Sequence, residues 1–171
     1  MPRYVVFLRG VSPQNCQMTR LRQALEQAGY EHVRTILSSG NAVLDASARS
    51  ENALEHALEK VLQSEFGRSF FPIVRTAKFV AKLVNEDPFA QLPLATGSKR
   101  IVSFLRTEVE SKIALPLSED TATVFCRRGR EIFSAYTPSP NGPVFMKLLE
   151  RAFGTEITTR TLDTVAKCAG A

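Results

Sequence analysis

The fold of the first half of the chain follows from the stretch VRTILSSGNAVL, which spans residues 33–44. Two apolar runs, residues 33–37 and 42–44, flank the small and polar turn Ser38-Ser39-Gly40-Asn41. Glycine and asparagine tolerate the positive φ angles that tight turns require, and short apolar runs bounded by such residues are typical of strands. The stretch therefore predicts two antiparallel strands joined by a short turn.

Strands and helices alternate on both sides of this hairpin. Residues 3–8 form an apolar run that predicts a buried strand, and residues 70–75 predict another. Apolar residues recur at helical spacing over residues 18–28 and 54–66, and the second stretch ends at Gly67, a typical C-cap residue. The resulting order, βαββαβ, is typical of the ferredoxin-like arrangement.

A short helix and a loop follow the fourth strand. Thr76 is the expected N-cap of the helix, whose apolar residues lie within residues 79–84. Residues 85–98 contain two prolines and a glycine, which favour a linker or surface loop. We expect the boundary between two halves of the chain in this segment.

The second half repeats the pattern. Residues 100–105 predict a strand, and Thr107 and Glu110 form a capping box for a helix that Pro116 ends. Residues 121–126 and 131–136 predict a hairpin.

The basic stretch RRGR, residues 127–130, forms the tip of that hairpin. Apolar spacing predicts a helix over residues 144–153 and a terminal helix over residues 161–169. In this prediction the last strand of the second half is absent or very short.

We therefore predict an α+β fold with two ferredoxin-like, βαββαβ-type halves, mostly antiparallel sheets and a C-terminal helix. The first half covers residues 1–84 and the linker covers residues 85–98. The second half, with the terminal helix, covers residues 99–171. The halves are expected to be related in the order of their elements but not in their residues.

The composition favours a protein that stays where it is made. No segment reaches the roughly 18 consecutive apolar residues of a membrane span, and the first apolar run breaks at Arg9, too early for a signal peptide. The cysteines Cys16, Cys126 and Cys168 form no CxxC pair, and the histidines have no metal-ligand spacing. We expect a cytoplasmic protein with no membrane contact, no metal site and no cofactor.

The basic residues raise the question of an anionic partner. The net charge is +5, and arginine supplies 15 of the 22 basic residues. Arginine makes planar, bidentate contacts to phosphate and carboxylate, so an anionic small molecule or a nucleic acid is a candidate partner. A solvated surface explains the same modest excess of charge.

Motifs at both ends of the chain carry a family resemblance. They are FLRGV at residues 7–11, VRT at residues 33–35 leading to SGN at residues 39–41, and TTR at residues 158–160. Together they resemble the signature of the DUF1697 family, bacterial proteins whose function is unassigned. The resemblance implies a pair of ferredoxin-like halves.

Two departures from the family pattern bear on binding. The family's first loop is usually glycine-rich with a lysine, whereas residues 12–17 are SPQNCQ in this chain. Leu162 stands where the family usually has an aromatic residue. If the loop or the aromatic residue holds a ligand, this chain is expected to hold it more weakly or differently.

Two motifs in the first half are candidate anion sites, each with a structural alternative. Arg9 leaves a buried strand, and Gly10 allows a ligand to approach the backbone; alternatively, Arg9 pairs with a carboxylate and Gly10 turns the chain. In the turn, Ser39, Gly40 and Asn41 offer N–H groups that can form an anion-binding nest. Hairpin chemistry alone explains the same residues.

The third candidate is Thr158-Thr159-Arg160, before the terminal helix. Helix N-termini present unpaired N–H groups and the positive end of a dipole, which favour an anion. Alternatively, a threonine caps the helix and Arg160 pairs with Asp163. If the two halves packed face to face, Arg9, Asn41 and Arg160 would converge on one ligand.

The leading hypothesis is a non-catalytic binder of a phosphorylated or nucleic-acid ligand at these residues. The sequence has no Walker A loop and no GxGxxG, GxSxG or HExxH motif. One alternative is a small transferase or hydrolase acting on a phosphate-containing substrate, although no general base stands out. Another is a partner-binding protein that uses the sheet edge left by the missing last strand.

Overall fold

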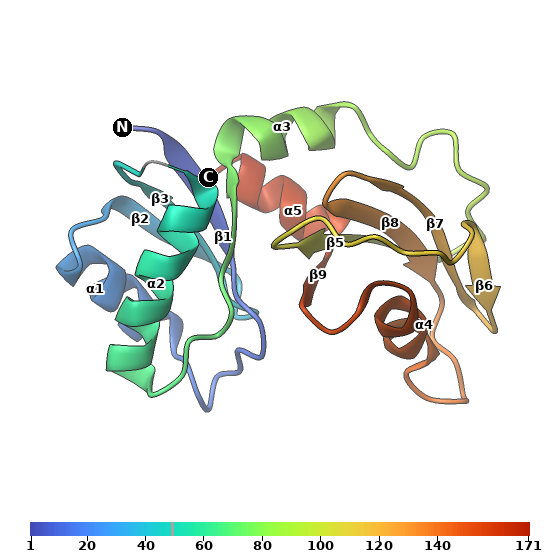
Figure 1. Cartoon of the computed structure of the whole chain (residues 1–171), viewed down its shortest axis with the longest axis horizontal. Coiled ribbons are helices and arrows are strands. Elements are labelled where there is room, and N and C mark those ends of the chain that lie inside the picture. Colours follow the sequence, from blue (N-terminus) through green and yellow to red (C-terminus); the bar gives the residue numbers. More distant parts are fainter. Residues whose placement is uncertain (49) are drawn as a thin grey trace. The chain divides into compact units, whose positions relative to one another are not determined.

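The computed structural model describes residues 1–48 and 50–171. Within these residues the chain is a mixed α/β protein with five helices and two antiparallel sheets of four and five strands (Figure 1). The chain forms two compact units, residues 1–85 together with 163–171, and residues 86–162. Each unit contains one of the two sheets.

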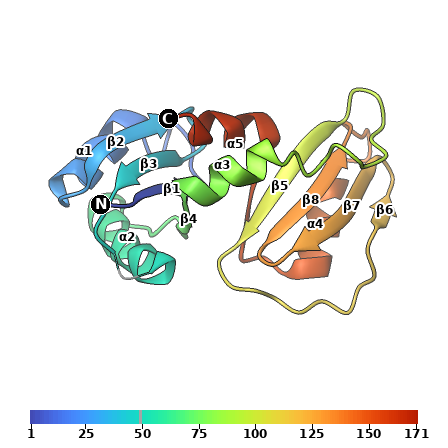
Figure 2. The same cartoon turned by 90° about the horizontal axis from the view of Figure 1, so that it is seen from above.

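The first unit is built around the hairpin of residues 33–44, which is confirmed. Its sheet has the order β2-β3-β1-β4, and all neighbouring strands run antiparallel. The strands are β1 (Arg3–Phe7), β2 (Glu31–Ile36), β3 (Asn41–Asp45) and β4 (Ile73–Thr76), and the helices are α1 (Met18–Gln27), α2 (Glu51–Phe66) and α3 (Ala77–Asn85). Figure 2 shows α1 and α2 on one side of this sheet and α3 on the other.

The apolar face of α2 supplies the centre of the first core. Ser50 caps the helix by accepting a hydrogen bond from the Ala53 N–H at 3.0 Å, and Gly67 ends it in the left-handed conformation that was expected of a C-cap. The leucines on this face are at most 2% exposed; they are Leu54, Leu58 and Leu62. Burial of a leucine side chain stabilises a fold by about 2 kcal/mol, so α2 holds the sheet firmly.

Two glutamates of α2 cover the edge strand β4. The carboxylate of Glu55, which is 1% exposed, accepts a hydrogen bond from the Val74 N–H at 3.0 Å. The carboxylate of Glu51 accepts one from the Thr76 N–H at 3.1 Å. These bonds satisfy N–H groups that an edge strand would otherwise leave unpaired.

The segment before β4 differs from its prediction. The strand begins at Ile73 and not at residue 70, because Phe70 and Phe71 have φ angles of 55° and 44°, outside the range of a strand. The helix after the strand is as predicted, since the Thr76 hydroxyl accepts a hydrogen bond from the Phe79 N–H at 3.2 Å and caps α3.

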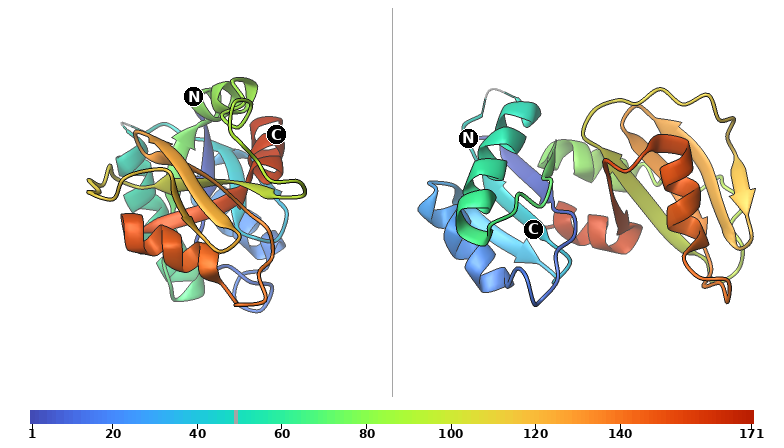
Figure 3. Two further views of the ribbon diagram at one scale, coloured as in Figure 1. Left: turned by 90° about the vertical axis from the view of Figure 1, so that its right-hand side faces the viewer. Right: turned by 60° about the horizontal axis from the view of Figure 1, so that its bottom comes forward.

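The second unit has a five-stranded sheet covered on one face by a helix. Its strands are β5 (Lys99–Leu105), β6 (Leu117–Glu119), β7 (Ala122–Arg128), β8 (Glu131–Tyr136) and β9 (Ile157–Thr161), in the order β6-β7-β8-β5-β9. Figure 3 shows α4 (Val144–Phe153) lying along this sheet, and its buried residues belong to the second core. The predicted hairpin of β7 and β8 is confirmed.

The prediction of a helix after the capping box at Thr107 is wrong. Residues 106–116 run without regular structure, and Val109 and Ile113 pack against the second core from that conformation. The Val109 carbonyl, which a helix would use to accept from the Ile113 N–H, instead accepts a hydrogen bond from Arg127. A stretch this short is a marginal helix, so tertiary packing decides its conformation.

The prediction that the last strand of the second half is absent or very short is also wrong. Residues Ile157–Thr161 form β9, a full partner of β5, and the Thr159 and Ser103 hydroxyls lie 3.0 Å apart across the pair. Threonine favours strands because its branched side chain fits a pleated surface. The sheet edge that the partner-binding alternative required is therefore occupied by β9.

The structure groups two segments differently from the predicted halves of the chain, namely the linker and the terminal helix. Phe89 is 2% exposed and packs edge-to-face on Phe133, with ring centroids 5.8 Å apart, so residues 86–98 belong to the second unit. The terminal helix α5 (Leu162–Ala169) was expected with the second half, but its residues from Asp163 onward group with the first unit. There the Ala171 carbonyl accepts a hydrogen bond from Arg3.

The two units share residues as well as strand order, which the sequence analysis missed. Without β6, the second sheet reads β7-β8-β5-β9, the same order as β2-β3-β1-β4. FLR begins at the last residue of β1, at residues 7–9, and recurs at the end of β5, at residues 104–106. The pattern RTxxxVAK starts at Arg75 and again at Arg160, and each of these arginines donates to the carbonyl of the preceding residue, at 2.9 and 2.8 Å.

Candidate functional site

Arg9 and Gly10 follow β1 in the chain and line a cavity. The cavity measures about 300 Å³ and is lined by Arg9, Gly10, Arg68, Ser69, Phe70 and Phe71. We call it the arginine cavity. It joins the end of the first strand to the segment between α2 and β4, which are far apart in the sequence.

Gly10 and Arg68 form the closest approach across the arginine cavity. Gly10 has a φ angle of 75°, and a Cβ atom at this position would lie 3.3 Å from Nη2 of Arg68. The Arg68 guanidinium also rests 4.9 Å from the centre of the Phe70 ring. The missing side chain of Gly10 therefore leaves room for a positively charged group beside the exposed backbone, where the Gly10 carbonyl accepts a hydrogen bond from the Asn15 amide at 2.9 Å.

The wall of the cavity is backbone held in an uncommon conformation. Phe70 and Phe71 both have positive φ angles, which non-glycine residues rarely adopt and which cost roughly 1–3 kcal/mol each. The Phe70 carbonyl accepts a hydrogen bond from the Arg9 N–H at 2.7 Å, which fixes the segment against β1. Strain of this kind clusters at ligand sites, so it supports a functional interpretation.

The second predicted motif lies at the same end of the first sheet. The Gly40 carbonyl accepts a hydrogen bond from the Leu8 N–H at 2.8 Å. A Cβ atom at Gly40 would lie 2.8 Å from Cγ2 of Val11, so only glycine fits beside the loop that follows β1. Gly40 thereby supports the backbone around Arg9.

The side chain of Asn41 is turned to the hairpin. Asn41 is fully buried, and its amide donates to the Ile36 carbonyl and to the Ser39 hydroxyl, both at 2.9 Å. These hydrogen bonds are the ones expected if Asn41 only stabilises the hairpin turn. Direct binding of a ligand by Ser39, Gly40 or Asn41 stays a prediction.

The third predicted motif belongs to the second unit. Thr158, Thr159 and Arg160 lie within β9 and not at an open helix N-terminus, because the chain pairs with β5 up to Thr161. Thr158 is 2% exposed, and its hydroxyl has no hydrogen-bond partner among the described residues. The structure thus brings Arg9 and the turn around Gly40 together, whereas the convergence with Arg160 stays a prediction.

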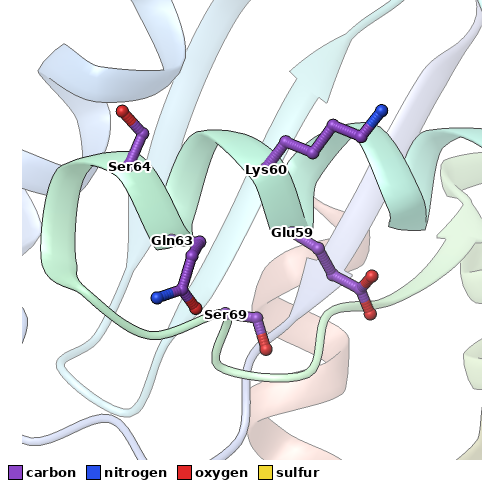
Figure 4. A pocket seen from close by; sticks show the side chains of 5 residues that line it. All are labelled: Glu59, Lys60, Gln63, Ser64 and Ser69. Atoms are coloured by element: carbon purple, nitrogen blue, oxygen red, sulfur yellow. The ribbon is translucent and has the colours of Figure 1, made fainter.

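A wider hollow lies beside the arginine cavity. It measures about 580 Å³ and is lined by Glu59, Lys60, Gln63 and Ser64 of α2 and by Ser69, which also lines the arginine cavity. We call it the α2 hollow. In Figure 4, Glu59 and Gln63 point to the side of Ser69, while Lys60 and Ser64 lie along the opposite edge of the helix.

Arg68 and its neighbours are the residues that the sequence analysis missed. Gly67 was identified as a C-cap, so Arg68 is the first residue after the cap of α2. The signal available was a basic residue at that point, followed by Phe70-Phe71-Pro72, a run in which the residue before proline is already restricted. Their approach to Arg9 depends on pairing between β1 and β4.

Two of the three cysteines have raised pKa values. Burial raises the pKa of the Cys16 thiol, with Arg20 partly offsetting it, and burial raises the pKa of Cys126, with Arg128 partly offsetting it. A raised pKa leaves less of the reactive thiolate at neutral pH. Within the described part of the chain, no three His, Cys, Asp or Glu side chains are grouped to hold a metal ion, and no helix is long and apolar enough to cross a membrane.

Comparisons with known proteins place the chain in a family. Among curated proteins, none matches this sequence. A conserved bacterial protein from Streptococcus pneumoniae has a similar structure, with a TM-score of 0.69 and 19% sequence identity over 99% of this chain and 97% of that one, a likeness that shows the fold alone. A family model described as "Protein of unknown function (DUF1697)" matches residues 1–133. This chain therefore belongs to the DUF1697 family.

Proposed function

We propose that this chain binds a small molecule carrying a phosphate group and holds it in the arginine cavity without changing it chemically. The observation behind the proposal is the pair Arg9 and Arg68, which line one cavity beside Gly10. Guanidinium groups offer five N–H donors in a planar fork that matches phosphate oxygens. A hydroxyl from Ser69 adds a neutral donor.

The surroundings of Arg68 keep its charge available. Among the described residues it makes a cation–π contact with Phe70 and no ion pair. By contrast, Arg20 and Arg22 are paired with Glu65 and Glu26 at 2.8 Å. An arginine held on a ring face and away from carboxylates can meet an anion without first giving up a salt bridge.

The size and lining of the cavity favour a small ligand that is bound and not transformed. A volume of about 300 Å³ lies at the lower end of small-molecule sites. The lining consists of arginine, glycine, serine and phenylalanine, which recognise an anion but supply no carboxylate or imidazole base. A nucleic acid would need a longer track of phosphate contacts.

Calorimetric titration with orthophosphate and pyrophosphate tests this proposal. We expect binding by the native chain, and Arg68→Ala should weaken it about tenfold or more, because a charge-assisted hydrogen bond is lost. Arg106→Ala is the control for the loss of an arginine outside the arginine cavity, since Arg106 follows β5 as Arg9 follows β1, and it should bind as the native chain does.

Several outcomes would count against the proposal. Binding that is absent from the native chain, or equal losses in Arg68→Ala and Arg106→Ala, would reject the arginine cavity. Tighter binding to a single-stranded oligonucleotide, with a steep loss as salt rises, would favour a nucleic-acid partner. Turnover of a phosphate ester that Arg68→Ala abolishes would favour the enzyme alternative.

Two further expectations remain proposals. We propose that the first unit is ferredoxin-like, which is supported by its βαββαβ order and its antiparallel strand order β4-β1-β3-β2. We also propose a cytoplasmic location, which is supported by three cysteines that are all free thiols.

A further inference from the structure

We infer that the phosphate group belongs to a sugar phosphate or polyol phosphate, whose hydroxyl-bearing part lies in the α2 hollow. This inference rests on the proposed function, because it uses the arginine cavity as the phosphate site. It adds the chemical class of the ligand and a second set of contacts. The two spaces share Ser69, so one molecule can reach from the guanidinium groups to the surface of α2.

The α2 hollow is lined entirely by polar side chains. Glu59 and Gln63 are four residues apart on the helix and therefore lie on one face, which Figure 4 shows directed to the side of Ser69. The Gln63 amide and the Ser64 hydroxyl make no hydrogen bond with any other part of the described chain. An amide and a hydroxyl each donate and accept, as the hydroxyl groups of a polyol do.

The direction of α2 sets the orientation of such a ligand. The hollow lies along the C-terminal half of the helix, where the last carbonyl groups lack intrahelical partners and the dipole is negative. Hydroxyl groups can donate to such carbonyls, whereas a phosphate group near this end of the helix needs the positive charges of Arg9 and Arg68 beside it. The phosphate group therefore belongs at Arg9 and Arg68, and the neutral hydroxyl groups belong beside Gln63 and Ser64.

The aromatic residues argue against a nucleotide. A nucleobase is usually held by stacking on an aromatic face, and no ring lines the α2 hollow. In the arginine cavity, which would hold the phosphate group, Phe70 already contacts the Arg68 guanidinium and meets Phe66 edge-to-face, with ring centroids 5.8 Å apart, and Phe71 is the other ring of the lining. A polyol needs no such surface.

Titration with three probes tests the inference: orthophosphate, sorbitol 6-phosphate and adenosine 5′-monophosphate. We expect sorbitol 6-phosphate to bind about tenfold more tightly than orthophosphate, since two or more neutral hydrogen bonds are added. Gln63→Ala should weaken sorbitol 6-phosphate about fivefold and leave orthophosphate unchanged. Gln23→Ala, an exposed glutamine on α1, is the matched control and should change neither.

The outcomes separate this inference from the proposed function. If orthophosphate and sorbitol 6-phosphate bind equally, or if adenosine 5′-monophosphate binds most tightly, the inference is wrong while the phosphate site stands. Equal weakening of both ligands by Gln63→Ala also overturns it, because the amide would then act on the phosphate site. If no phosphate compound binds the native chain, both the inference and the proposed function fail.

Discussion

The ends of β1 and β5 carry the same three residues in different surroundings. FLR stands where each strand ends, and in each unit the leucine N–H donates to a carbonyl of the next hairpin, Leu8 to Gly40 at 2.8 Å and Leu105 to Arg130 at 2.9 Å. After the arginine, the chain continues with Gly10 in the first unit and with Thr107 in the second. The strand therefore presents an arginine in both units, and neighbouring segments decide what that arginine can do.

The connection from the helix to the last strand makes the difference. In the first unit residues 67–72 join α2 to β4 and bring Arg68 and two phenylalanines to the end of β1. In the second unit only residues 154–156 join α4 to β9, and they end in Glu156. The comparison indicates that the arginine cavity requires the longer connection in addition to the strand motif.

The largest expected effect comes from the carboxylate that anchors β4 after this longer connection. Glu55→Ala should lower the free energy of unfolding by about 3 kcal/mol, because the buried Val74 N–H loses its acceptor and a cavity remains. Urea denaturation measures the change. Glu55→Gln keeps an acceptor oxygen of the same shape and should lose clearly less; equal losses in the two variants would show that the hydrogen bond is unimportant.

A second change makes the first unit resemble the second. Gly10→Thr places a branched residue at a φ angle of 75° and a Cβ atom 3.3 Å from the Arg68 guanidinium. We expect a loss of about 2 kcal/mol in stability and a loss of phosphate binding, since the closed arginine cavity no longer admits an oxyanion. Thermal unfolding and calorimetric titration measure the two effects.

The matched control for this substitution is Thr107→Gly in the second unit. It should change phosphate binding little, because the connection that supplies Arg68 has no counterpart there. Phosphate binding by Gly10→Thr at native affinity would show that Gly10 is only a turn residue. The comparison between the two units would then lose its functional meaning.

The smallest expected effect concerns pH and again distinguishes the units. Asp45 lies opposite Arg3 and accepts a hydrogen bond from it at 2.7 Å, and this contact, assisted by His32, lowers the pKa of Asp45 despite an opposing effect of burial. At the corresponding position of the second sheet, Arg100 lies opposite Ala135, which cannot titrate.

A lowered pKa in the folded state fixes the sign of the pH dependence. The contribution of Asp45 is fully present above the pKa of an unfolded aspartate, about 3.9, and is lost as the pH falls through the lower folded value. Asp45→Asn should therefore cost up to about 1 kcal/mol at neutral pH and nothing in strong acid. Urea denaturation across this range measures it, and a cost that is independent of pH would contradict the assignment.

The successful sequence predictions rest on local chemistry. The turn at Gly40, the C-cap of α2 at Gly67 and the cap at Thr76 each depend on residues that are near in sequence, and both glycines adopt positive φ angles. Arg9-Gly10 is also visible in the sequence as a charge that follows an apolar strand, and its role in binding stays a prediction.

The failures occur where packing overrides local preference. The capping box at Thr107 did not produce a helix. Val109 and Ile113 pack against the second core instead, and this packing outweighs the small stability of so short a helix. The polar stretch from Thr158 to Arg160 became a strand, because β5 offered an unpaired edge. In both cases the deciding partner lies far away in the sequence.

The sequence by itself determined the order of helices and strands along the first unit, the C-terminal end of α2 and the presence of Arg9 beside Gly10. Local backbone preferences and apolar periodicity suffice for these features, because each involves residues within one or two turns of chain. Tertiary structure alone decided that Arg68, Ser69 and two strained phenylalanines face Arg9, since only the pairing of β1 with β4 brings segments some 60 residues apart together. The candidate site is therefore a product of strand pairing, and the sequence motif supplies one side of it.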